Sequence, residues 1–283
     1  MVFKNKEYEF GRWKISTESI WKIPVLVAVL YRTQFGVEFL DSFAKKHPKA
    51  IERFGKISLY TCYISFIVLL FGLIYSTSLF FAPIQPAKEA VGVILPSAVQ
   101  TASVYIQVLE PIAQSKWVLL VPTLAWVISL MLIILIHEGG HALVSSSKGL
   151  KPKSTGVGLV GLFVPFLPIA FVEPDVDSFK NLNVKDQSEI ASAGPAMNIL
   201  ASIFLFLLGI ILGVFLNVNL FDSTIIWWIF LLNLAIGTTN LLPIPKLDGS
   251  YIVNGIENKV VKYSLNYSLL IVFVAMVVIS IIK

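Results

Sequence analysis

The run His-Glu-Gly-Gly-His at residues 137–141 combines residue types and a spacing that suit metal chemistry. In a helix, residues four apart project from one face about 6 Å apart along the axis, so His137 and His141 could hold one metal ion. Glu138 would lie next to that face. Two such histidines bind Zn²⁺ while the glutamate acts as general base towards a metal-bound water. The sequence therefore predicts one zinc ion on His137 and His141, with Glu138 as the catalytic base.

The position of this run in the chain strengthens the prediction. It continues directly from residues 117–136, which carry no charge and are long enough to cross a membrane. Ionisable side chains in hydrocarbon cost on the order of 3 kcal/mol each unless they face a cavity or a partner. Such a cluster in a membrane span is functional by default, and a structural pair of buried histidines is the alternative.

A catalytic zinc needs a third protein ligand and keeps one position open. Asp248 is the predicted ligand, because Pro243 and Pro245 break the preceding helix shortly before it. That helix and the helix of the two histidines are expected to run towards the same side of the membrane. The alternative for Asp248 is a turn aspartate in front of a glycine. Rival carboxylates on the same side are Glu173, Asp175 and Asp177.

Two asparagines could support such a site. Asn240, one helical turn before the first of those prolines, is predicted to donate a hydrogen bond to the reacting carbonyl or to orient the carboxylate of Asp248. A hydrogen bond between helices is the alternative for Asn240. Asn198 follows the small residues 193–195, and for Asn198 a hydrogen bond to a neighbouring helix is the favoured interpretation.

The composition predicts an integral membrane protein. Of 283 residues, 56% are hydrophobic and 14% are charged. Five uncharged runs can each cross a hydrocarbon core of about 30 Å at about 1.5 Å per residue. They are residues 57–82, 117–136, 190–221, 223–245 and 263–282. The predicted fold class is an all-α polytopic membrane protein of five to six transmembrane helices, with a three-helix catalytic core and a small membrane-associated β-hairpin.

The β-hairpin is predicted at residues 154–172, which are uncharged but carry glycines and prolines that make a regular helix costly. Irregular backbone at membrane depth needs a cavity or protein around it, so this segment is expected to pack beside the active site. A kinked sixth helix is the alternative. Residues 23–31 are apolar but too short to span, so an interfacial segment is the better interpretation for them.

The distribution of charge predicts the topology. Residues 1–56 hold eleven Lys and Arg against six Asp and Glu, while residues 57–283 hold eleven of each. By the positive-inside rule the N-terminus is cytosolic, the loop at residues 83–116 lies outside, and the active site lies towards the cytosolic side. We therefore expect a basic cytosolic or interfacial segment over residues 1–56 that favours anionic lipid, followed by a membrane domain over residues 57–283. This charge excess is no footprint of nucleic-acid binding.

The run HEGGH together with NLLPIPKLDG at residues 240–249 resembles the signatures of the site-2 protease family of intramembrane metalloproteases. Residues 193–198 look like the third-helix motif of that family, and the resemblance covers about residues 117–250. It implies one zinc ion, a core of three helices and cleavage of transmembrane protein substrates after partial unwinding, often in regulated intramembrane proteolysis. The N-terminal segment is similar to the leader of archaeal members. Only about 40 residues separate the second and third spans, which leaves no room for the PDZ domain of many bacterial members.

Together these residues predict peptide-bond hydrolysis within the membrane. Glu138 takes a proton from the zinc-bound water, and Asn240 is the predicted donor to the oxyanion. An edge strand within residues 154–172 could hold the unwound substrate by β-augmentation. The alternatives are a divalent-metal transporter, since intramembrane His and acidic residues also mark ion pathways, and a catalytically silent membrane scaffold.

Overall fold

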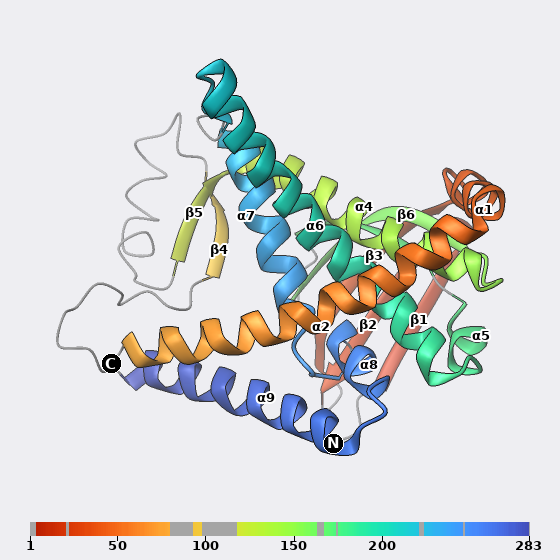
Figure 1. Ribbon diagram of the computed structural model, residues 1–283. Coiled ribbons are helices and arrows are strands. Elements are labelled where there is room, and N and C mark those ends of the chain that lie inside the picture. Colours follow the sequence, from red (N-terminus) through yellow and green to blue (C-terminus); the bar gives the residue numbers. More distant parts are fainter. Residues whose placement is uncertain are drawn as a thin grey trace.

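The structure is a computed structural model that describes residues 4–20, 23–79, 93–97, 118–162, 167–173, 175–220, 224–245 and 247–282. Most of these residues are helical (Figure 1). The helices are α1 (Val37–Lys46), α2 (Pro48–Leu79), α4 (Thr123–Ser147), α5 (Val176–Lys180), α6 (Val184–Leu216), α7 (Thr224–Thr239), α8 (Asp248–Asn254) and α9 (Lys259–Ile282). The strands are β1 (Lys4–Phe10), β2 (Trp13–Ile20), β3 (Ile23–Thr33), β4 (Val93–Ser97), β5 (Val118–Pro122), β6 (Ser154–Leu162) and β7 (Leu167–Glu173).

Three helices of the described chain are long and apolar enough to cross a membrane. They are the segments Pro48–Tyr75 in α2, Trp126–Ser147 in α4 and Val184–Leu216 in α6. The apolar helix α7 is shorter, at 16 residues. The prediction of a membrane protein is confirmed in this coarser form, whereas the number of five to six spans is not. Most of the loop predicted over residues 83–116 lies outside the described residues.

The second predicted span begins later than expected. Residues 118–122 form β5, which pairs in parallel with β4 instead of starting the helix. The candidate span in α4 therefore runs from Trp126 to Ser147 and contains the whole run 137–141. The uncharged stretch alone could not show where the helix begins, because an apolar run serves a strand as well as a helix.

Helix α6 lies at the centre of the helices and packs against α2, α4, α7 and α8. A Cβ atom on Gly140 of α4 would lie 2.6 Å from the carbonyl oxygen of Ala193 in α6. Only a residue without a side chain allows this approach, which is the packing that small residues give to membrane helices. α7 contacts both α4 and α6. These three helices form the predicted three-helix core.

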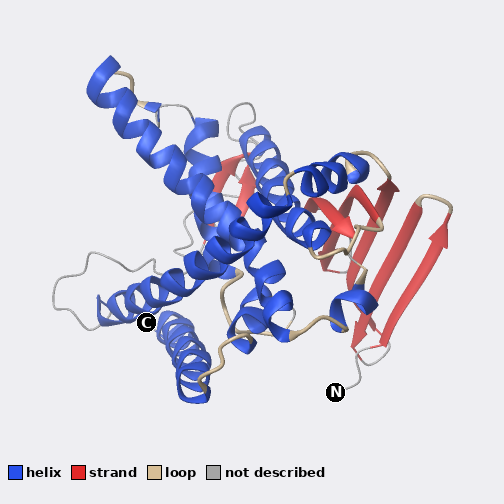
Figure 2. Ribbon diagram, turned by 45° about the vertical axis from the view of Figure 1, so that its right-hand side comes forward, coloured by secondary structure: helices blue, strands red, loops and turns tan. Residues whose placement is uncertain are grey.

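The predicted hairpin is present as β6 and β7, but it belongs to a larger sheet. The strand order is β1-β2-β3-β6-β7, with every neighbouring pair antiparallel. Figure 2 shows this sheet as a layer on one side of the helices. The prediction of a mostly helical protein is confirmed, but a sheet of five strands stands where only a small hairpin was predicted. Residues 23–31, expected as an interfacial segment, lie in the central strand β3.

A charged cluster fastens the end of β7 to the N-terminal strands. The carboxylate of Glu173 accepts a hydrogen bond from Ser154 at 2.7 Å and lies 3.6 Å from Lys14 and 3.8 Å from Arg32. Partial burial alone would raise the pKa of Glu173, but the Ser154 hydrogen bond and the two cations hold that pKa below its ordinary value. Three other strands therefore restrain the end of β7.

Candidate metal centre

Helix α4 places His137 and His141 one turn apart on the face that looks towards α6. Their rings meet edge to face with centroids 4.8 Å apart, and their Nε2 atoms are 3.2 Å apart. His137 is buried. The spacing of four residues thus brings both imidazoles to one point, as the helix predicted from the sequence requires.

Asp248, the first residue of α8, reaches the same point from the other side of α6. Its Oδ2 lies 3.1 Å from Nε2 of His137 and 3.4 Å from Nε2 of His141. α7 ends at Thr239, and the backbone N–H of Gly249 donates to the carbonyl oxygen of Asn240 at 2.7 Å. This bond closes the proline-containing turn, so the turn holds α8 and its carboxylate beside α4.

These three side chains fit a zinc ion by ligand type and by spacing. A tetrahedral zinc with bonds of about 2.0 Å separates its ligands by about 3.3 Å. The observed separations are 3.1, 3.2 and 3.4 Å. In the described part of the chain, the His, Cys, Asp and Glu residues form this one group of three or more that could hold a metal. The rival carboxylates Glu173, Asp175 and Asp177 are not in it.

Each histidine has a partner on its second ring nitrogen. Nδ1 of His141 lies 2.8 Å from the carbonyl oxygen of Ile190 in α6. A carbonyl oxygen can only accept, so Nδ1 carries the hydrogen and Nε2 keeps its lone pair for a metal. Such second contacts fix the ring and the tautomer of a ligating histidine.

Asn198 gives His137 the equivalent contact. This fully buried amide lies 3.1 Å from Nδ1 of His137. With the amide nitrogen facing the ring, the Oδ1 atom of Asn198 is buried without a partner. With the amide turned over, Oδ1 accepts the Nδ1 hydrogen, and Nε2 of His137 keeps its lone pair for a metal. Asn198 therefore contacts a predicted ligand, whereas the sequence favoured a bond that only joins helices.

The backbone of α6 closes one side of the cluster at Gly194. A Cβ atom there would collide with Nε2 of His141 and lie 2.7 Å from Nε2 of His137. The space that a side chain would take is the space between the two imidazoles. Gly194 belongs to the run 193–198 that the sequence singled out, and its contact with both rings explains why that position has no side chain.

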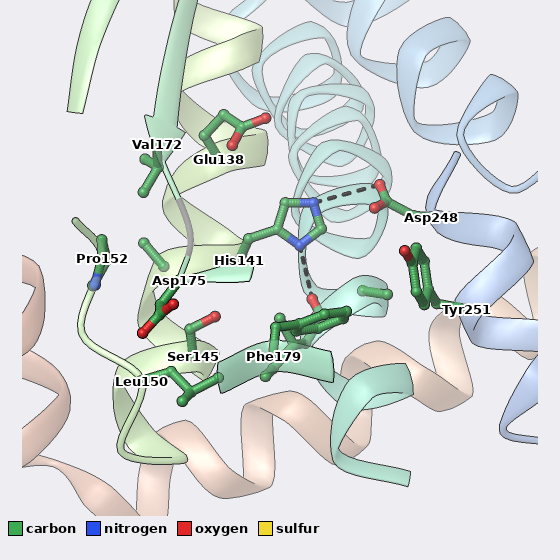
Figure 3. Close-up of a pocket in the computed structure, with 13 residues that line it drawn as sticks. Glu138, His141, Ser145, Leu150, Pro152, Val172, Asp175, Phe179, Asp248 and Tyr251 are labelled. Atoms are coloured by element: carbon green, nitrogen blue, oxygen red, sulfur yellow. Dashed lines mark hydrogen bonds and ion pairs between the residues drawn. The ribbon is translucent and has the colours of Figure 1, made fainter. Parts of the chain in front are cut away.

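A cavity of about 230 Å³ opens beside the cluster. It is lined by Glu138, His141, Ala142, Ser145, Leu150, Pro152, Val172, Asp175, Phe179, Ile190, Ala191, Asp248 and Tyr251. Figure 3 shows Glu138 and Asp248 on opposite sides of His141. The predicted base and two predicted ligands, His141 and Asp248, therefore share a cavity whose walls are mostly apolar, and the end of β7 reaches this cavity through Val172.

Asn240 contributes its backbone to the turn that precedes Asp248. Its side chain is not among those that line the cavity, and its carbonyl oxygen is the group that holds the backbone next to Asp248. The role of Asn240 as a donor to the reacting carbonyl stays a prediction. Tyr251, which does line the cavity, was missed, because nothing in its sequence position distinguishes it from a residue on the outer face of α8.

Helices that can cross a membrane, with a His and Asp cluster that could hold a metal, define the class of membrane metallopeptidases. The chain belongs to Peptidase family M50, which it matches over residues 125–225 and 218–282, and this confirms the predicted site-2 protease family. It is similar to the uncharacterized protein MJ0971 of Methanocaldococcus jannaschii, with 38% identity over 81 residues. That match covers 28% of this chain and 21% of the relative. No solved structure matches the chain.

Proposed function

We propose that this protein is a zinc-dependent endopeptidase that cleaves the transmembrane segments of membrane-anchored substrates within the bilayer, as in regulated intramembrane proteolysis. The observation that carries the proposal is the triangle of His137, His141 and Asp248. Its two histidines lie on a helix able to span the membrane, and Asp248 joins them from α8 beside a cavity that Glu138 also lines. Membership of the M50 family supports the same reaction class.

The residues of this chain divide the work of peptide hydrolysis between them. His137, His141 and Asp248 would hold the zinc ion, which when bound acidifies a water molecule and polarises the carbonyl of the substrate. Glu138 takes the proton of the attacking water and passes it to the leaving amine. Asn198 and the carbonyl of Ile190 keep the two imidazoles in the tautomer that can bind metal.

The substrate must be extended before it can react, because a helical peptide group is shielded by its own hydrogen bonds. β7 is an edge of the described five-stranded sheet, and its residue Val172 lines the cavity. An unwound substrate segment could pair with the free edge of β7 and bring one of its peptide bonds to the cavity. This arrangement supports the prediction that an edge strand in the hairpin holds the substrate.

The proposed location is the cell membrane, with the N-terminus and the active site towards the cytosol. The excess of Lys and Arg in residues 1–56 supports this orientation, and it favours anionic lipid on the same side. The proposed partners are transmembrane protein substrates and the lipid bilayer.

The test is cleavage of a membrane-anchored reporter by the purified protein in liposomes. The wild type is expected to release a fragment cut within the transmembrane segment, and Glu138→Gln is expected to bind one zinc ion without cutting. Cleavage by Glu138→Gln at the wild-type rate contradicts the proposed base. Zinc flux into the liposomes without cleavage identifies a transporter. If the zinc-loaded wild type shows no zinc flux and no cleavage, the protein is a scaffold.

A further inference from the structure

We propose that the hydroxyl group of Tyr251 donates a hydrogen bond to the oxyanion of the tetrahedral intermediate. This inference rests on the proposed function, because it assigns a residue to that reaction. It names a donor that lines the cavity, which the side chain of Asn240 does not.

The position of Tyr251 carries the first step of the argument. It lies three residues after Asp248 in α8, so both side chains project from the same side of the helix. Tyr251 lines the cavity together with Glu138 and His141. In Figure 3 its ring stands beside Asp248 with the hydroxyl end turned towards the carboxylate.

The ring of Tyr251 is held while its hydroxyl group is left free. Phe179 meets the ring edge to face at a centroid distance of 5.4 Å, and Ser188 donates to the carbonyl oxygen of Tyr251 at 2.9 Å. The hydroxyl has no hydrogen-bond partner among the residues that the structure describes. Tyr251 is 38% exposed, and the contacts with Phe179 and Ser188 position its ring so that the unused O–H is available as a donor in a mostly apolar cavity.

The reaction can use a donor on this side of the cavity, in addition to the polarisation that a bound zinc ion would supply. When the oxygen of the water bonds to the carbonyl carbon of the substrate, Glu138 accepts a proton from that water. The π electron pair of the carbonyl group moves onto the carbonyl oxygen, which becomes the oxyanion. Tyr251 faces the cavity on the side of His141 opposite to Glu138, where it can donate to that oxygen. When the C–N bond breaks, the electron pair returns, the amine takes the proton from Glu138, and Tyr251 keeps its own proton throughout.

The test compares Tyr251→Phe with the wild type in the liposome assay. The loss of one oxyanion donor is expected to lower kcat by about 100-fold while KM stays within about 3-fold. A matched control is Tyr263→Phe in α9, where the tyrosine is exposed and stacks on Tyr267 instead of facing the cavity. That control is expected to cleave as the wild type does.

A second measurement does not depend on turnover. A phosphinate peptide mimics the tetrahedral oxyanion, and its Kd is expected to rise about 100-fold in Tyr251→Phe, in parallel with the loss in kcat. The Kd of an uncleavable substrate peptide is expected to stay unchanged. The zinc content is expected to stay at one ion per chain in every variant.

The outcomes separate the inference from the function on which it rests. A wild type that cuts no membrane substrate overturns the proposed function. If the wild type cuts the substrate and Tyr251→Phe has the same kcat or the same Kd for the phosphinate peptide as the wild type, the proposed role of Tyr251 is wrong. If Tyr251→Phe folds poorly, two other variants replace it. Tyr251→His keeps an N–H donor and is expected to retain more activity than Tyr251→Leu. Equal activities of these two variants would also contradict the role of Tyr251.

Discussion

The buried amide of Asn198 lies 3.1 Å from Nδ1 of His137, on the opposite side of the imidazole from the nitrogen that faces Asp248. One ring therefore connects an amide in α6 to a carboxylate in α8. Because the amide decides which nitrogen of the ring carries the hydrogen, it also decides whether Nε2 can bind a metal.

Asn198→Ala is expected to lower zinc affinity about 10- to 100-fold, because His137 loses the group that fixes its tautomer. Competition with a chelator of known zinc affinity measures the Kd for zinc in each variant. The matched control is Asn233→Ala in α7, which removes a buried asparagine that donates to the carbonyl of Ile229 instead of a histidine. Equal zinc affinities in Asn198→Ala and the wild type would contradict the orienting role.

Gly194→Ala is expected to abolish zinc binding, because its Cβ atom would enter the space between the two imidazoles. Bound zinc measured after purification and dialysis gives the result. Gly213→Ala is the control in the same helix, since a Cβ atom there meets nothing within 4 Å. That substitution is expected to leave zinc binding intact and to stabilise α6 by up to about 1 kcal/mol. Full zinc content in Gly194→Ala would show that the backbone of α6 does not close the site.

The ion cluster around Glu173 predicts a pH dependence of the end of β7. A carboxylate whose pKa is lowered in the folded state contributes stability above its unfolded pKa of about 4.5, and this contribution is lost as the pH falls through the folded value. The protection of the amides of residues 167–173, which is the intrinsic hydrogen-exchange rate at each pH relative to the observed rate, is therefore expected to fall below about pH 4.5 in the wild type.

In Glu173→Gln the same amides are expected to be less protected already at pH 7, and their protection is expected to depend less on pH. Glu257→Gln serves as control, because Glu257 is exposed and makes no ion pair within the described residues. Identical exchange profiles for Glu173→Gln and the wild type would mean that the cluster does not restrain β7.

Lys148→Met is expected to destabilise the protein by about 3 to 5 kcal/mol, because it leaves a buried carboxylate unpaired. Lys148 follows α4 and lies 2.5 Å from Asp186 and 2.6 Å from the buried Glu189, both in α6. Unfolding in mixed detergent micelles measures the change. Lys56→Met breaks only an exposed pair with Glu52, so it is expected to leave the free energy of unfolding nearly unchanged. Similar losses in the free energy of unfolding for the two variants would contradict the conclusion that the buried carboxylate of Glu189 needs Lys148 as its partner.

Local spacing explains why the candidate site could be predicted from the sequence. His137 and His141 share a helix face whatever surrounds them, and the positions of charges and prolines predicted that Asp248 lies on the same side of the membrane. Asn198 and Tyr251 could not be assigned in this way. The contact of Asn198 depends on how closely α6 approaches α4, and that of Tyr251 depends on the direction of α8 after its turn.

The sheet shows a second limit of sequence reasoning. The hairpin of β6 and β7 follows from glycines and prolines that disfavour a helix, so it could be predicted. The pairing of Val29 with Leu159 joins positions that are far apart in the chain, and no local pattern records it. Residues 23–31 are too short to span a membrane, and an apolar run of this length suits a strand as well as an interfacial segment.

The strand order β1-β2-β3-β6-β7 also has a consequence for the order of events during synthesis. β1, β2 and β3 leave the ribosome before α2 and α4, yet the edge of β3 stays open until β6 has been made. An open apolar edge invites pairing with other chains. The edge of β3 therefore stays unpaired while the two long helices α2 and α4 are made and enter the membrane. During this interval a chaperone or a change in the translation rate would affect how often the nascent chain aggregates through that edge.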